Sequence, residues 1–250
     1  MKAIIIAAGI GSRLGDLTKD LPKPLVDVNG KSILQRQIEI FNKFGIDEIF
    51  IVTGYKHDKI KFSNVSYIYN SEYQQTEQIG SLMKARNQIS GDLIISFGDI
   101  LFEESILEQL LEKKEDFVLV CDPDWKNSYE QRSDNPPTQS DFVALENNNI
   151  KKFFKNSLEI NDSFSVVEFI GLMKLSSISS TIFTQTYENL EKSHNGKFHF
   201  ASSFMKAKLI DFFEELRSIG TEMHALNING KWCEIDTIQD LEIAKKLFRK

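Results

Sequence analysis

Residues 4–14 read Ile-Ile-Ile-Ala-Ala-Gly-Ile-Gly-Ser-Arg-Leu, an apolar run that passes directly into a glycine-containing loop. A short continuous apolar run predicts a strand that is buried on both faces. Gly9 and Gly11 allow backbone N–H groups to approach a phosphate closely. Arg13 adds a planar cation that suits phosphate oxygens. The run therefore predicts an α/β fold with an anion-binding turn after its first strand.

The rest of the first half alternates strands and helices. We expect strands at residues 48–53, 65–69, 93–97 and 117–121, and helices at 31–44, 78–88 and 104–113. Because the connections between them are short, this order indicates a mixed, mostly parallel sheet with helices on both faces.

The second half is less regular. We expect a loop at 122–141, strands at 142–145, 166–174, 226–228 and 232–235, and helices at 181–192, 204–219 and 237–248. Thr237 and Asp240 have the spacing of a capping box at the start of the last helix. Since no linker or repeat interrupts the pattern, residues 1–250 are predicted to form a single domain.

Composition narrows the functional classes. The chain has 250 residues, of which 41% are hydrophobic, and a net charge of −6, which argues against nucleic acid as a partner. Cys121 and Cys233 form no CxxC pair and are expected to be buried, reduced thiols. No run approaches the roughly 20 apolar residues of a membrane span, and the first nine residues are too short for a signal sequence. We expect a cytoplasmic protein without a membrane partner.

The glycine loop alone leaves several interpretations open. A dinucleotide fingerprint needs a third glycine where this chain has Leu14. A P-loop would use Gly-Lys-Ser at 30–32, but Leu25 occupies the position of its first glycine. A tight turn without a ligand also stays open. Lys23 lies between two prolines, which fix the backbone on both sides, and a lysine presented so rigidly suits a triphosphate.

The run from Gly9 to Leu14, followed by Pro22-Lys23, resembles the nucleotidyltransferase family with a GT-A-like, Rossmann-like α/β fold. Further resemblance extends over residues 70–82, 97–99, 122–132, 168–176 and 230–241. The last three segments are similar to one branch, which contains the cytidylyltransferases for phosphocholine and 2-aminoethylphosphonate and the NTP transferase domains associated with phosphoenolpyruvate mutases. The resemblance implies transfer of CMP from CTP to a small, often amine-bearing phosphorylated or phosphonylated acceptor.

The resemblance also implies a magnesium site and a phosphate site. Asp99 follows a buried strand and Asp236 follows a short one, and ligands of open α/β sheets bind at the carboxyl ends of strands. A lone aspartate there is often only a turn former, but both positions match the family's Mg²⁺ ligands. Arg13 and Lys23 are implied as the catalytic cations. Asp92, Asp122 and Asp124 lack that match and are expected to be solvated loop residues.

Further residues are assigned to the two substrates. The nucleotide is expected to contact Arg13 and Lys23 together with Ala7, Ala8, Gly9, Gly11, Ser12, Gln78 and Ser81. The acceptor is expected to contact Tyr129, Arg132, Glu168 and Trp232. Arg132 would bind its anion, and Glu168 or an aromatic face would meet an amine. Residues 1–121 then form the nucleotide-binding half and 122–250 the acceptor-binding half.

Two other functions stay open. The first is a sugar-1-phosphate nucleotidyltransferase that uses UTP, dTTP or GTP, because Thr76-Glu77-Gln78 stands where relatives often have asparagines. The second is a nucleotide-binding module without catalysis. The sequence is also compatible with either a monomer or a homodimer.

Overall fold

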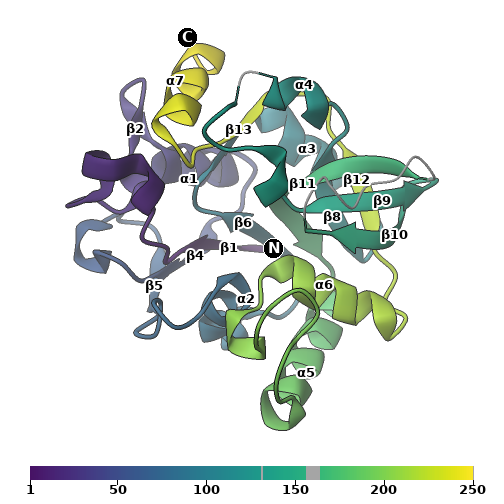
Figure 1. Ribbon diagram of the computed structural model, residues 1–250. Coiled ribbons are helices and arrows are strands. Elements are labelled where there is room, and N and C mark those ends of the chain that lie inside the picture. Colours follow the sequence, from purple (N-terminus) through teal and green to yellow (C-terminus); the bar gives the residue numbers. More distant parts are fainter. Residues whose placement is uncertain (131, 156–163, 250) are drawn as a thin grey trace.

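A mixed sheet forms the centre of the molecule in the computed structural model, which describes residues 1–130, 132–155 and 164–249. Within these residues the sheet has nine strands in the order β5-β4-β1-β6-β11-β8-β12-β10-β9. They are β1 (Lys2–Ala7), β4 (Glu48–Thr53), β5 (Ser66–Tyr69), β6 (Leu93–Phe97), β8 (Phe117–Asp122), β9 (Phe142–Glu146), β10 (Asn149–Phe154), β11 (Ser165–Leu175) and β12 (His224–Asn227). The predicted α/β class is confirmed (Figure 1).

The direction of the strands determines which residues meet at one edge. β5, β4, β1 and β6 are parallel, so their carboxyl ends lie at the same edge of the sheet. β11 runs antiparallel to β6 and β8, which brings its amino-terminal part to that edge. The parallel pairing that we predicted thus belongs to the first half, and the second half adds mainly antiparallel pairs.

Helices cover both faces of the sheet. Helices α1 (Ile33–Lys43) and α3 (Glu104–Glu112) pack on one face, and α2 (Gln78–Leu82), α5 (Ser177–Ser193) and α6 (Leu209–Ser218) pack on the other. A third apolar cluster joins α7 (Ile238–Leu247) to the strand pair β2 (Asp27–Val28) and β3 (Lys31–Ser32). Thr237 caps α7, and its capping box with Asp240 is confirmed.

Two short strands outside the main sheet link distant parts of the chain. β7 (Ile100–Phe102) pairs antiparallel with β13 (Trp232–Glu234), so that Ile100 lies opposite Glu234. The N–H of Ile235 also donates to the carbonyl of Asp99 at 2.9 Å. This β7–β13 ribbon fastens the end of β6 to the segment before α7.

The structure changes several predicted boundaries. Neither β7 nor β10 was predicted, and the expected loop at 122–141 contains the short helix α4 (Trp125–Tyr129). The expected helix at 78–88 changes to a 3₁₀ helix from Met83 to Gln88. The expected helix at 204–219 starts only at Leu209, because the Asp211 carboxylate accepts the N–H of Lys208 at 2.8 Å and caps the helix there. Further 3₁₀ segments occur at Ser12–Thr18, Lys23–Leu25, His57–Lys59, Pro137–Gln139 and Phe204–Lys206.

Two predictions about the chain as a whole can also be compared with the structure. Cys121 and Cys233 are buried and form no disulfide with each other, as predicted. Among the described residues, we find no helix with the length and apolar character needed to cross a membrane.

Candidate active site

A cavity of about 1080 Å³ opens at the carboxyl ends of β1 and β6. The glycine loop after β1, Lys23, the start of α2 and Gly98-Asp99 after β6 form one side. Glu168 of β11, Lys208 before α6 and the β13 segment complete the wall. Both halves of the chain therefore contribute, and their division into a nucleotide half and an acceptor half stays a prediction.

Three carboxylates meet in this cavity. Asp99, Glu234 and Asp236 each offer an oxygen, and these oxygens lie within 4.8 Å of one another. The β7–β13 ribbon creates this arrangement, because it holds the chain just before β7 beside the chain just after β13. Asp99 and Asp236 were predicted to converge, whereas Glu234 was not singled out.

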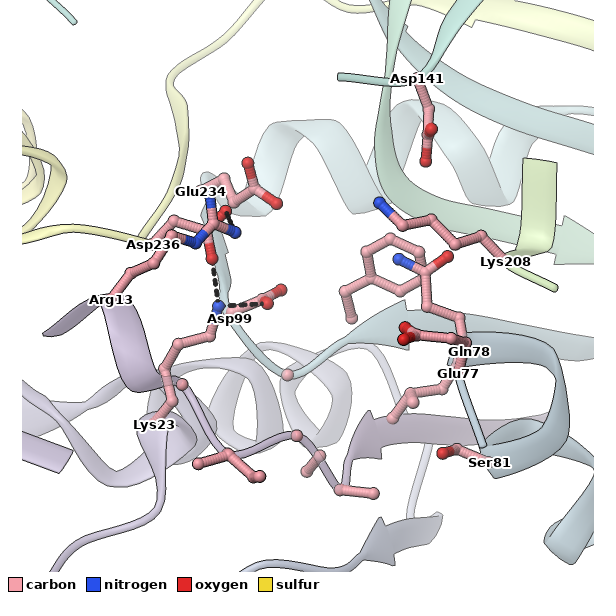
Figure 2. A pocket seen from close by; sticks show the side chains of 18 of the residues that line it. Arg13, Lys23, Glu77, Gln78, Ser81, Asp99, Asp141, Lys208, Glu234 and Asp236 are labelled. Carbon is pink, nitrogen blue, oxygen red and sulfur yellow. Dashed lines mark hydrogen bonds and ion pairs between the residues drawn. The ribbon is translucent and has the colours of Figure 1, made fainter. Parts of the chain in front are cut away.

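Two cations lie against the carboxylates, as Figure 2 shows. The Nζ atom of Lys23 is 2.6 Å from Asp99 Oδ2 and 2.5 Å from Asp236 Oδ1. The Arg13 guanidinium lies 2.6 Å from Asp236 Oδ2 and donates to Asn135 Oδ1 at 3.1 Å. Lys23 is only 9% exposed, so its charge acts where water screens it little.

The pKa values follow from this crowding of charge. Burial alone would lower the pKa of Lys23, but Asp99 and Asp236 outweigh it, so the pKa lies above its ordinary value. Burial alone would raise the pKa of Asp236, but Lys23 and Arg13 hold it below its ordinary value. For Glu234, burial and the charges of Asp236 and Asp99 act together, and its pKa is raised well above the usual range.

Gly11 lets Lys23 reach the carboxylates. Its φ is 69°, in the left-handed region that favours glycine. A Cβ at Gly11 would lie 2.7 Å from the Cβ of Lys23. The glycine loop and the lysine are thus one packed unit, although Gly11 and Lys23 are 12 positions apart in the sequence.

The carboxylates fit a hard divalent cation. Such ions take carboxylate oxygens as ligands together with phosphate oxygens and water. Asp99 Oδ1 is buried and has no hydrogen-bond partner among the described residues. An ion between the three carboxylates would satisfy that oxygen, so the residues present suit Mg²⁺.

The residues expected to bind the nucleotide lie in the cavity wall. Ala7, Ala8, Gly9, Gly11, Ser12, Gln78 and Ser81 all line it. Gln78 Oε1 accepts the N–H of Leu209 at 3.1 Å, which fixes the side chain at the start of α6. The Ser81 hydroxyl accepts from the Asn70 side chain at 3.0 Å. Their contacts with a nucleotide stay predictions.

The residues expected to bind the acceptor divide into two layers. Glu168 and Trp232 line the cavity, whereas Tyr129 and Arg132 lie behind its wall. Arg132 donates to Asp240 Oδ1 at 2.8 Å and stacks 4.7 Å from the centre of the Tyr129 ring. The direct contacts of Tyr129 and Arg132 with the acceptor stay predictions. In the structure, these two residues support Glu168 on the side away from the cavity.

Glu168 is held in place by that second layer. The Tyr129 hydroxyl donates to Glu168 Oε1 at 2.6 Å and also contacts Ser140. Glu168 is 3% exposed, and its Oε2 has no partner among the described residues. Burial raises the pKa of Glu168 to about 7, although Tyr129 and Arg132 act in the opposite direction.

The prediction for Asp122 was wrong. Asp122 is 5% exposed rather than solvated, because it ends β8 and its carboxylate accepts from Trp232 Nε1 at 2.8 Å and from the N–H of Asp124 at 2.7 Å. Asp92 and Asp124 are exposed, as predicted. Asp122 therefore orients the Trp232 ring in the cavity wall.

Sequence reasoning missed several polar residues of the cavity. Among them are Asn135, Asp141, Lys155, Lys208 and Glu234. Only Glu234 had a usable signal: positions 232, 234 and 236 alternate along an extended segment, and all three line the cavity.

Comparisons with known proteins give a consistent result. Residues 3–134 match the family described as MobA-like NTP transferase domain. A CTP:phosphoglutamine cytidylyltransferase of Campylobacter jejuni is 31% identical over 97% of this chain and 98% of its own length. The bifunctional protein GlmU of Methanococcus vannielii is 28% identical over 100% of this chain, which spans 55% of that protein.

Solved structures are similar in fold. The CTP:phosphocholine cytidylyltransferase of Streptococcus pneumoniae matches with a TM-score of 0.73, over 99% of each chain, at 17% identity. This likeness confirms the predicted fold, including the mixed sheet with helices on both faces.

Proposed function

The chain belongs to the family of MobA-like NTP transferase domains and is a nucleotidyltransferase, and from this premise we propose that it transfers CMP from CTP to a small acceptor with a phosphate or phosphonate group. One observation carries the proposal: the Lys23 ammonium lies between Asp99 and Asp236 in a cavity lined by the glycine loop. CTP as donor is supported by the names of the relatives from C. jejuni and S. pneumoniae.

In the proposed reaction, an oxygen of the acceptor's phosphoryl group attacks the α-phosphorus of CTP. A phosphorus–oxygen bond forms, the bond from the α-phosphorus to the bridging oxygen breaks, and pyrophosphate leaves with that electron pair. A phosphate monoester has lost its second proton above about pH 6. The attacking oxygen therefore needs no general base.

The chain's own residues would position the two anions and offset their repulsion. Lys23 would stabilise negative charge near the α-phosphate, and Arg13 with the N–H groups of Gly11 and Ser12 would bind the departing phosphates. Asp99, Glu234 and Asp236 would hold Mg²⁺. When bound, Mg²⁺ would supply Lewis-acid stabilisation of the phosphate charge.

The nucleotide base would lie against Ala7–Gly9 with Gln78 and Ser81, and the acceptor would lie along Glu168 and Trp232. Residues 1–121 would thus serve mainly the nucleotide and residues 122–250 mainly the acceptor. A cytoplasmic location, the lack of a nucleic acid partner and the oligomeric state stay predictions.

Pyrophosphate release tests the proposal. The purified protein with MgCl₂ is assayed with CTP, UTP, dTTP and GTP against phosphocholine, 2-aminoethylphosphonate and hexose 1-phosphates. We expect release with CTP and a nitrogen-bearing acceptor, and its loss in Asp236→Asn but not in the exposed control Asp124→Asn. Release only with a hexose 1-phosphate and another NTP would contradict the proposal. CTP binding without release for any acceptor would instead indicate a non-catalytic module.

A further inference from the structure

Two opposite charges face each other at the end of the cavity away from Lys23 (Figure 2). Asp141 lies just before β9, and Lys208 lies just before α6. Both line the cavity, yet they form no ion pair with each other in the part of the chain that the structure describes. A ligand with two charges of its own can complete such a separated pair.

Asp141 has unused hydrogen-bonding capacity at this end. Its Oδ1 atom is buried and lacks a partner within the described residues. A buried acceptor atom without a partner costs roughly 1–3 kcal/mol. A ligand ammonium with N–H groups would satisfy this oxygen, whereas a quaternary ammonium has no N–H to donate.

Tyr129 offers no open aromatic face to a quaternary ammonium. Its ring is stacked by the Arg132 guanidinium at 4.7 Å. Quaternary ammonium groups are recognised chiefly by open aromatic faces, and Trp232 is left for such a contact in the cavity wall. The preference for a primary ammonium therefore rests on the unpartnered Asp141 oxygen, which needs an N–H donor.

Lysines at the same end suit an anion. The Nζ atom of Lys155 is 3.9 Å from Asp211 Oδ2, a long contact. Asp211 is already used by the N–H groups of Phe200 and Lys208, each at 2.8 Å. Lys155 and Lys208 therefore both have charge available to a ligand carboxylate in the cavity.

We propose that the acceptor is zwitterionic at the end away from its phosphoryl group, with a primary ammonium bound by Asp141 and a carboxylate bound by Lys208 and Lys155. Its chemical class is thus a phosphorylated or phosphonylated amino acid. This inference rests on the proposed function, because it concerns the acceptor of the same transfer.

A panel of five acceptors separates the two charges. With CTP and MgCl₂, kcat/KM for pyrophosphate release is measured with O-phosphoserine, phosphoethanolamine, 3-phosphoglycerate and 2-hydroxyethyl phosphate. Phosphoethanolamine lacks the carboxylate, 3-phosphoglycerate replaces the ammonium by a hydroxyl, and 2-hydroxyethyl phosphate lacks both charges. O-phosphohomoserine is included to allow for a longer spacer. We expect kcat/KM for the better of O-phosphoserine and O-phosphohomoserine to exceed kcat/KM for phosphoethanolamine and for 3-phosphoglycerate by about tenfold or more. A charged hydrogen bond usually contributes that much.

Two variants assign the charges to residues. Lys208→Met should bring the ratio of kcat/KM for the zwitterion over phosphoethanolamine close to one. Lys206→Met should keep the ratio, because Lys206 does not itself line the cavity and its ammonium donates to the Gln74 carbonyl. Asp141→Asn should reduce the preference for the zwitterion over 3-phosphoglycerate, whereas the exposed control Asp134→Asn should not.

The failures of the two proposals look different. If phosphoethanolamine or phosphocholine is used as well as the zwitterions, or if Lys208→Met keeps the preference, the zwitterionic acceptor is wrong and the cytidylyltransferase proposal stands. If no acceptor gives pyrophosphate with CTP, both proposals fall together.

Discussion

The two ends of the cavity treat charge in opposite ways. At the phosphate end, Lys23 and Arg13 lie within 2.6 Å of carboxylate oxygens. At the acceptor end, the opposite charges of Asp141 and Lys208 stand apart. Buried oxygens without a partner among the described residues occur in both regions: Asp99 Oδ1 at the phosphate end, and Asp141 Oδ1 and Glu168 Oε2 in the acceptor region. The two ends therefore differ in whether their opposite charges are paired with each other.

This difference indicates how the site divides its work. Every nucleotidyl transfer needs the same arrangement around the triphosphate, so a pre-paired cluster keeps its geometry before any substrate enters. The choice of acceptor depends on groups that only the right molecule satisfies, since a buried polar group left unpaired penalises the wrong one. The first end should then tolerate less change than the second.

The largest expected effect comes from breaking the paired end. Lys23→Ala removes the cation between Asp99 and Asp236. Loss of a preorganised charge contact costs roughly 2.7–4 kcal/mol of transition-state stabilisation, or about 10²–10³ in kcat. Pyrophosphate release measures it, with Lys19→Ala as the exposed control on the same segment. A Lys23→Ala enzyme with near-normal kcat would show that the pairing is structural only.

The buried Glu168 carboxyl group in the acceptor region should make the free energy of unfolding depend on pH. The folded chain raises the pKa of Glu168 from 4.5 to about 7, so it keeps a proton that the unfolded chain has lost. The contribution of Glu168 to the free energy of unfolding is therefore intact below about pH 4.5, declines as the pH rises to about 7, and is then constant. The total loss is about 3 kcal/mol at most.

Glu168→Gln removes this proton linkage. Relative to wild type, the variant should gain stability between pH 4.5 and pH 8, as urea unfolding at both pH values would measure. The free energy of unfolding of Glu112→Gln, at an exposed position of α3, should change with pH as that of wild type does. If the same were found for Glu168→Gln, the Glu168 carboxyl group would be no costlier to ionise than an ordinary one. The contrast between the two ends of the cavity would then weaken.

A smaller effect separates backbone strain from the pairing itself. Gly11 and Gly15 both have positive φ, at 69° and 58°, so alanine at either should cost about 1–2 kcal/mol of stability. Only at Gly11 would the new Cβ press on Lys23, at 2.7 Å, whereas a Cβ at Gly15 meets nothing within 4 Å. We expect kcat to fall about tenfold in Gly11→Ala but not in Gly15→Ala. A tenfold fall corresponds to roughly 1.4 kcal/mol of activation free energy. Equal kcat values in the two variants would mean that Lys23 tolerates displacement.

The paired end was largely predictable from the sequence. Local patterns carry it: an apolar strand leads into the glycine loop, two prolines flank Lys23, and Asp99 follows a buried strand. Glu234 was missed because β7 was not recognised, and without the ribbon the alternation of 232, 234 and 236 had no partner to face.

The acceptor end was hardly predictable. Asp141, Lys155 and Lys208 come from three irregular segments that only the folded sheet brings together. Lys208 was predicted to lie inside a helix. Nothing in the local sequence shows that the Asp211 carboxylate accepts the N–H of Lys208, so that the helix begins only at Leu209. Asp122 was misjudged for the same reason: its partner Trp232 lies 110 positions further along the chain.

The β7–β13 ribbon has a consequence for how the protein is made. During translation, Asp99 and the glycine loop emerge early, while Glu234 and Asp236 follow only after more than half of the chain has been added. A nascent or prematurely terminated polypeptide therefore lacks two of the three oxygen donors. Such fragments cannot assemble the complete centre. They therefore cannot consume nucleotide before folding is finished.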